Sequence, residues 1–131
     1  MAKSKFIKKV MVFGWVAVFL GLVITFWGVV SSMKMAANDI GENAANAFHK
    51  DKVESLLLLI DSDKHSLKEK NDAIWALGVL KDRRALSKLE SLASGSKSDQ
   101  AEKLCLSEIE KSISKIKGKF ILSWPMECNS Q

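Results

Sequence analysis

The sequence predicts an all-α protein, in which one N-terminal transmembrane helix is followed by a small domain of about five helices. Three observations predict this class. A run of 21 residues, Val10–Val30, contains no charged residue. After it, apolar residues recur at three- and four-residue steps between helix caps, as in amphipathic helices. The chain has one proline and no tyrosine, and no segment alternates as a strand does for more than a few residues.

Val10–Val30 has the length and composition of a membrane span. Wound as a helix it reaches about 31 Å, which matches the hydrocarbon thickness of a bilayer. Its ends carry aromatic residues, which favour the membrane interface: Phe13, Trp15, Phe26 and Trp27. A buried helix of a soluble core would keep a polar stripe and need a larger protein around it. A cleavable signal peptide would have a shorter apolar region and a cleavage site soon after it, so we expect an uncleaved anchor.

The lysines on the two sides of the span predict its orientation. Lys3, Lys5, Lys8 and Lys9 precede it, whereas Lys34 is the only basic residue between the span and Lys50. Positively charged flanks stay in the cytoplasm. We therefore expect a basic cytoplasmic tail (1–9), a transmembrane helix (10–30), and on the outer, periplasmic or extracytoplasmic side a helical domain (31–118) with a C-terminal tail (119–131).

The net charge of +5 is distributed unevenly. Four of the 20 basic residues precede the span, and all 15 acidic residues follow it. The part from Lys34 onward, with 16 basic and 15 acidic residues, carries only +1. This balance gives no electrostatic basis for a nucleic-acid partner, while the basic tail suits anionic lipid headgroups.

The first two helices of the domain are predicted from their caps and apolar stripes. Met33–Phe48 is expected to be helical, either continuing the membrane helix or following a break near Ser31, with a buried face of Ala37, Ile40, Ala44, Ala47 and Phe48. Asp51 caps the second helix, whose stripe is Val53, Leu56, Leu57 and Ile60, and Asp61-Ser62-Asp63 ends it.

Three further helices follow. Ser66 and Glu69 form a capping-box pattern before the third, which buries Ala73, Ala76, Leu77 and Leu80, and Gly78 predicts a closely approaching backbone. Asp82 caps the fourth, which Gly95 ends, with a stripe of Ala85, Leu86, Leu89, Leu92 and Ala93. The fifth is predicted to start at Ser98 or Asp99 and to end at Gly118, burying Ala101, Leu104, Cys105, Ile109, Ser112, Ile113 and Ile116. Lysines gather at its end, which the helix dipole favours, with lipid binding as the alternative role: Lys111, Lys115, Lys117 and Lys119.

The segment Asn71–Ala93 resembles a HEAT-type repeat of the lyase-like HEAT family. The matching positions are Ala73, Ala76, Leu77, Gly78, Leu80, Asp82, Ala85, Leu86, Leu89 and Leu92. An internal echo supports it, because Asp51 and Asp82 lie 31 residues apart before similar apolar spacings. The resemblance implies an α-solenoid of about two and a half repeats, with those alanines, leucines and Gly78 in its core, that binds other proteins through stacked helices. Some lyase-like members act on bilins, but no residues that would carry such chemistry are found here.

The span itself carries a candidate binding feature. Small residues follow one seam of the helix: Gly14, Ala17, Gly21, Thr25 and Gly28. In lipid such a groove lets helix backbones approach, so the seam predicts packing against another span, from a second copy or from a partner. Chance remains an alternative, since glycine is common in membrane helices.

The other chemistry-bearing residues give weaker signals. Cys105 and Cys128 would form a disulfide in an oxidising compartment, or Cys105 is a buried core thiol. His49 and His65 fall in predicted turns without a second ligand at suitable spacing, and Asp61-Ser62-Asp63 lacks the glycine and glutamate of a calcium loop. Trp75 reads as a core residue, whereas Trp124 could dock on the last helix, cover its edge or meet the membrane. We expect no catalytic, cofactor or metal site.

These observations favour a non-catalytic, membrane-anchored protein-interaction module or adaptor, working through a HEAT-like helical surface. The alternative is an accessory subunit of a larger membrane complex, held through its transmembrane helix. A lyase-like enzyme is a remote third reading. The expected partners are the lipid bilayer and other proteins, including another transmembrane helix or a second copy of this chain.

Overall fold

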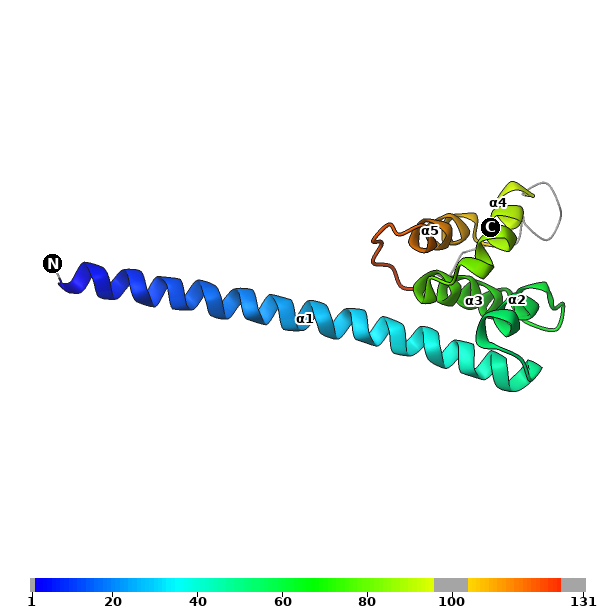
Figure 1. The fold of residues 1–131 in the computed structure, drawn as a ribbon, viewed down its shortest axis with the longest axis horizontal. Helices are drawn as coiled ribbons and strands as arrows, with labels where there is room; N and C mark the ends of the chain where they lie inside the picture. Colours follow the sequence, from blue (N-terminus) through cyan, green and yellow to red (C-terminus); the bar gives the residue numbers. More distant parts are fainter. Residues whose placement is uncertain (1, 96–103, 126–131) are drawn as a thin grey trace. The chain divides into compact units, whose positions relative to one another are not determined.

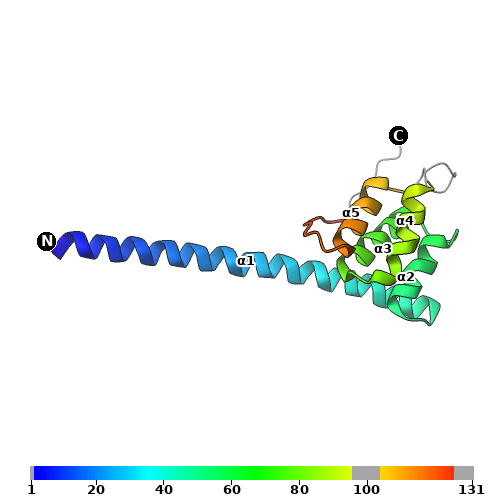
Figure 2. The ribbon, with the colours of Figure 1, turned by 45° about the horizontal axis from the view of Figure 1, so that its top comes forward.

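The computed structural model describes residues 2–95 and 104–125, with side chains from residue 13 onward, and every regular element in this part is helical. The elements are α1 (Ala2–Phe48), α2 (Lys52–Asp61), α3 (Leu67–Leu80), the 3-10 turn η1 (Arg83–Ala85), α4 (Leu86–Ser94) and α5 (Leu106–Ile116), as Figures 1 and 2 show. The all-α prediction is confirmed for the described residues. The chain divides into two compact units, unit 1 (Met1–Ser32) and unit 2 (Met33–Gln131), and each is described by itself.

Unit 1 is the apolar part of α1. Every side chain from Phe13 to Val29 is exposed, and the most apolar 18-residue window of this helix has a mean hydropathy of 2.2. One helix near the N-terminus is therefore long and apolar enough to cross a membrane. Its hydroxyl groups bond to its own backbone: Thr25 Oγ1 donates to the Leu22 carbonyl at 2.9 Å, and Ser32 Oγ donates to the Gly28 carbonyl at 2.9 Å.

Helix α1 continues through Ser31 and Ser32 into unit 2, so of the two predicted alternatives the structure has the continuous helix and not the break. Ala37 and Ala44 are buried, and Ile40 and Phe48 pack partly buried against the same core. Ala47 was predicted to be buried, but it is exposed. The buried face instead includes Met33 and Gly41. Lys52 of α2 packs against Gly41, and its Nζ donates to Asn38 Oδ1 at 2.6 Å and to Glu42 Oε1 at 2.9 Å.

The predicted caps of the next helices are confirmed. Asp51 accepts a hydrogen bond from the Val53 backbone N–H at 3.3 Å and begins α2. Ser66 and Glu69 form the reciprocal capping box of α3. Asp82 caps the 3-10 turn η1, which leads directly into α4, so the fourth helical segment begins with a tighter turn than predicted. Gly95 ends α4 as expected.

Helix α3 lies at the centre of unit 2 and packs against α2 and α5. It is fully buried over the run Ala73–Leu77. The predicted close approach at Gly78 is confirmed, because an added Cβ there would lie 2.8 Å from Ser112 Cα. Asn71 of α3 accepts a hydrogen bond from the Cys105 backbone N–H at 3.1 Å. Both contacts join residues 34 apart in sequence, so α3 and α5 run in the same direction.

The prediction for the start of the fifth helix was wrong. Leu104 and Cys105 are not helical, and α5 begins at Leu106, while Ser98, Asp99 and Ala101 lie outside the described residues. The physical reason is the side chain of Asn71, which takes the Cys105 N–H that a continuous helix would use internally. The Cys105 carbonyl then accepts the first N–H bonds of α5, from Glu108 and Ile109. Gly118 ends this segment with a φ of +93°, which suits glycine.

Candidate functional site

The small residues of the span lie along one face of unit 1. In a helix of 3.6 residues per turn, Gly14, Ala17, Gly21, Thr25 and Gly28 fall within about 80° of arc. All five are exposed, and apart from the neighbouring backbone of the helix itself no heavy atom of the described residues lies within 4 Å of a Cβ built on any of the three glycines. The seam is therefore a shallow groove that no described part of the chain fills. Because the Thr25 hydroxyl is bonded to the Leu22 carbonyl, the groove offers van der Waals contact rather than polar chemistry.

A second candidate site, which is polar and aromatic, lies in unit 2 around Trp75. This indole is fully buried in α3, and its Nε1–H donates to the carbonyl of Ser123, in the segment after α5, at 2.6 Å. Trp124 stacks on it, with ring centroids 6.2 Å apart and planes inclined by 14°. Three alternative roles were predicted for Trp124, one of them docking on the last helix, but the ring on which Trp124 stacks belongs to α3. The Trp124 side chain nevertheless remains about half exposed.

Two charged side chains of α5 are buried, and one of them, Lys115, lies beside Trp75. The Lys115 ammonium lies 5.7 Å from the centre of the Trp75 ring, and this residue is only 2% exposed. Glu108 is fully buried, and Lys111 Nζ lies 3.7 Å from its Oε2. Neither the Glu108 carboxylate nor the Lys115 ammonium forms a hydrogen bond with the described residues. Lys115 therefore does not sit at a solvated helix end, as the helix-dipole interpretation supposed.

Burial dominates the electrostatics of this cluster. Desolvation raises the pKa of Glu108 above its usual range, against the opposing pull of the Lys111 and Lys115 charges. Desolvation likewise lowers the pKa of Lys115, which the Glu108 charge partly offsets. Both groups are thus held in surroundings that disfavour their charged forms. Groups with pKa values shifted in this way occur both at functional sites and in structural ion networks.

The sequence held a signal for this cluster that helix periodicity makes visible. Ser112 was predicted to be buried, and it is. Glu108 and Lys115 stand four residues before and three residues after it, which places them on the same helix face. The predicted buried face included Ile109, Ile113 and Ile116 but neither Glu108 nor Lys115.

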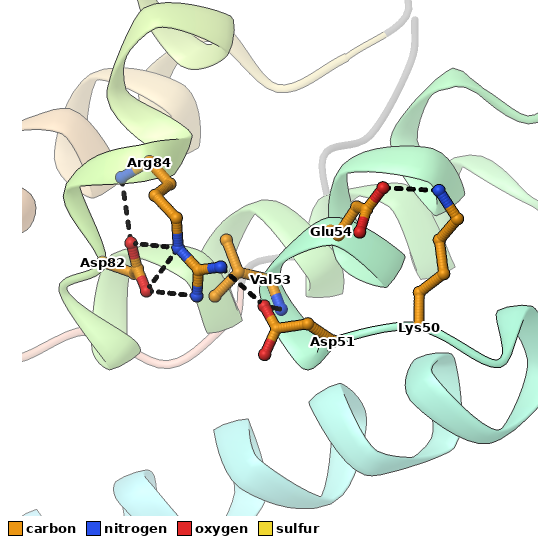
Figure 3. A network of polar contacts seen from close by, with 6 residues as sticks. All are labelled: Lys50, Asp51, Val53, Glu54, Asp82 and Arg84. Atoms are coloured by element: carbon orange, nitrogen blue, oxygen red, sulfur yellow. Dashed lines mark hydrogen bonds and ion pairs between the residues drawn. The ribbon is translucent and has the colours of Figure 1, made fainter.

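The predicted repeat core divides into a fully buried and a partly buried set. Ala73, Ala76, Leu77, Gly78 and Leu89 are buried, whereas Leu80, Leu86 and Leu92 pack partly exposed against the core. The two capping aspartates meet on the surface of unit 2. Arg84 lies between them, with Nη1 2.9 Å from Asp51 Oδ2 and Nη2 2.8 Å from Asp82 Oδ2, as Figure 3 shows. Hydrogen bonds from Arg84 lower the pKa of Asp82.

The remaining candidates bring together little chemistry. Cys105 is engaged in a disulfide, while Cys128 lies outside the described residues, so the Cys105–Cys128 pairing stays a prediction. His65 lies 3.7 Å from Glu69, and its ring is 5.9 Å from that of Phe48. No group of three or more metal-ligating side chains occurs among the described residues. A small pocket of about 160 Å³ between α2, α3 and α4 is lined by Ile60, Asp61, Asp63, Leu67, Lys70, Leu92 and Leu104.

Comparison of the chain with protein-family models, with curated proteins and with solved structures found no match. The HEAT resemblance therefore stays a prediction that depends on the residues quoted for it and on the packing described above.

Proposed function

We propose that this chain is a single-pass membrane protein with a cytoplasmic N-terminus, which works without catalysis by associating with another protein through its span. The observation that carries the proposal is the exposure of every side chain from Phe13 to Val29, within a stretch of α1 that contains no charged residue. Exposed apolar surface of this extent is unfavourable in water and favourable in lipid. The open groove at Gly14, Gly21 and Gly28 supplies a surface on which a second helix can pack.

Within this proposal, the span acts as both anchor and interaction surface. The accessory-subunit reading therefore takes precedence over a freely diffusing adaptor, because the open groove lies in the span. The partner is another transmembrane helix, from a larger complex or from a second copy. Unit 2 lies on the outer face of the membrane, as the lysine asymmetry predicts.

A HEAT-like adaptor surface is the second candidate, and a specific arrangement favours it. Helices α3 and α5 run in the same direction, as equivalent helices of successive repeats do in solenoids. The two capping aspartates, Asp51 and Asp82, share one arginine and so place the starts of α2 and η1 side by side. In this reading the surface of α2 and α4 would meet a partner protein, with the ion pair of Lys88 and Asp61 at 2.6 Å holding the two helices together.

A topology reporter tests the membrane proposal. A reporter active only outside the cytoplasm, fused after Gln131, should be active, and a reporter active only in the cytoplasm should be silent at the same position. Replacing Lys3, Lys5, Lys8 and Lys9 by glutamine should weaken this bias. The reverse pattern of reporter activity would overturn the orientation.

Native sizing after extraction in mild detergent separates the two candidates. An accessory subunit should migrate in a complex much larger than the 14.5 kDa chain, and the complex should depend on the span. An adaptor that works through unit 2 should migrate alone or as a small oligomer, with variants on α2 and α4 affecting partner binding instead.

A further inference from the structure

The segment after α5 presents an apolar strip, defined here as Phe120, Leu122 and Trp124. The backbone of residues 119–125 is not helical, and alternate side chains point outward. The three members of the strip are 66%, 50% and 51% exposed, whereas the intervening Ile121 and Ser123 are half-buried. The alternation is that of an extended chain in which every second side chain is exposed.

The strip is fixed in place and is not a loose end. The carbonyl of Ser123 accepts the Trp75 indole N–H at 2.6 Å, and Trp124 stacks on the same indole. At the other end of the segment, the backbone N–H of Lys119 donates to the Ser114 carbonyl at 2.9 Å. Two anchors, one at each end, therefore fix the segment that carries these three exposed apolar side chains. Contiguous exposed apolar residues of this kind mark a protein or membrane contact.

Within the stretch 117–125, which carries the strip, the charge has one sign. Residues 117–125 contain two lysines, Lys117 and Lys119, and no acidic residue. Both lysines are exposed, and Lys117 also forms an ion pair with Glu90 of α4, at 2.7 Å. Aromatic rings beside lysines suit the headgroup region of a bilayer, where the rings lie at the interface and the ammonium groups meet anionic phosphates.

The strip also lies at the end of unit 2 where the chain enters it. Within unit 2, Figures 1 and 2 both place the segment after α5 at the same end as the unit's first residues, in its part of α1. The unit begins at Met33, three residues after the end of the apolar run at Val30. If Val10–Val30 spans the bilayer, this end of unit 2 is tethered at the membrane surface, where the effective concentration of lipid is high.

We propose that the apolar strip inserts into the headgroup region of the membrane that the chain itself spans, with Lys117 and Lys119 contacting anionic lipid. The proposal depends on the span proposed above and adds a second membrane contact to it. Insertion would seat unit 2 against the bilayer in one orientation. The stack of Trp124 on buried Trp75 would then couple that contact to the core of unit 2.

The test is photo-crosslinking of the full chain, reconstituted in vesicles of equal parts phosphatidylcholine and phosphatidylglycerol. A benzophenone amino acid replaces Leu122 in one variant and Leu106 in the matched control. Leu106 is 42% exposed and stands at the opposite end of α5, so the two sites share residue type and exposure. Lipid adducts should form at position 122 in several-fold higher yield than at position 106. In the same vesicles, Lys119→Gln should lower the yield by up to about fivefold, the change expected for one lysine at an anionic surface.

Three results would overturn the proposal: equal lipid yields at positions 122 and 106, an adduct with a second protein chain at 122, or no adduct at 122. The second result would identify the apolar strip as a protein-binding surface instead. A third variant, with the photoreactive residue at Phe19, separates this proposal from the one it depends on. Lipid adducts at position 19 without adducts at 122 would reject the strip contact alone, whereas their absence at position 19 would reject the span.

Discussion

The glycines of the two units stand in opposite surroundings. In unit 2, a Cβ added to Gly78 would lie 2.6 Å from Ser112 Oγ and 2.8 Å from Ser112 Cα, closer than real side chains approach. In unit 1, a Cβ added to Gly14, Gly21 or Gly28 would meet no atom within 4 Å. Glycine lowers the stability of any helix by about 1 kcal/mol relative to alanine. At Gly78 the close contact with Ser112 of α5 requires a residue without a side chain, which explains why glycine is present despite its cost in helix stability. Among the described residues of unit 1, no such contact explains the glycines.

The two units also differ in where they place apolar and charged groups. Unit 1 exposes large apolar side chains along its whole described length, and unit 2 buries a carboxylate and an ammonium beside an indole. The first arrangement is favourable in lipid and the second is costly in any solvent. In unit 1, both the uncovered glycines and the exposed apolar side chains would be stabilised by a partner or a solvent outside the chain. Buried charges need an explanation inside the chain.

The largest expected effect separates the two kinds of leucine. Leu77→Ala removes a fully buried side chain from the centre of unit 2 and should cost about 2–5 kcal/mol, a large share of the stability of a small domain. Leu20→Ala removes a side chain of unit 1 that is 55% exposed, so it should leave unit 2 unchanged. Thermal unfolding of the full chain in detergent should show a melting temperature at least about 8 °C lower for Leu77→Ala. An unchanged melting temperature would contradict the burial of Leu77.

A pair of alanine substitutions tests the two kinds of glycine. Gly78→Ala forces Cβ against the Ser112 backbone, which should cost about 1–3 kcal/mol for overpacking, reduced by the gain in helix propensity. Gly21→Ala meets no atom in the chain and should leave the unfolding of unit 2 unaffected. Circular dichroism melting curves of both variants check this. If Gly78→Ala were as stable as the parent, the α3–α5 contact would be looser than described.

Local signals in the sequence predicted most of the helices. The caps at Asp51 and Ser66 and the helix end at Gly118 depend on a few neighbouring residues, so their chemistry is readable from the sequence. The close approach at Gly78 was predictable as well, because glycine destabilises a helix interior and is expected there only where a neighbouring backbone leaves no room for a side chain. These features are set by hydrogen bonds and sterics within one or two turns.

Features set by distant residues were not predictable in this way. The start of α5 depends on a hydrogen bond from Cys105 to Asn71, 34 residues away. The burial of Lys115 depends on Trp75, 40 residues away in sequence, whose indole is in turn bonded to Ser123 in the segment after α5. Ala47 lies next to correctly predicted residues, yet it is exposed, because the crossing of α2 at Gly41 decides which face of α1 is covered. In each case the packing partner, and not the local pattern, decides the outcome.

The groove in unit 1 predicts a change in association and not in folding. Gly21→Leu would fill the groove with a large side chain and should weaken self-association or complex formation by tenfold or more, about 1.4 kcal/mol. Leu20→Ala, on another side of the helix, is the matched control and should leave association unchanged. Cross-linking yield and complex size in mild detergent measure both. If Gly21→Leu changed neither quantity, the seam would be idle and the span only an anchor.

The smallest expected effect concerns the buried carboxylate. Since burial raises the pKa of Glu108 in the folded state, the unfolded state loses this proton at lower pH than the folded state does. As the pH rises through the ordinary carboxyl range, the folded state of unit 2 is therefore destabilised by this group. Glu108→Gln keeps the shape of the side chain without the charge, so it should raise the melting temperature slightly at pH 7.

The same reasoning predicts how the gain depends on pH. Below about pH 4 the parent carboxyl is protonated in both states, so the advantage of Glu108→Gln should disappear there. Glu110, exposed on the same helix, provides the control, and Glu110→Gln should show no such gain at either pH. Melting curves of the three proteins from pH 3 to pH 8 measure the difference. If Glu108→Gln instead lowered the melting temperature at pH 7, attraction to Lys111 and Lys115 would outweigh desolvation, and the buried cluster would stabilise the fold rather than cost it stability.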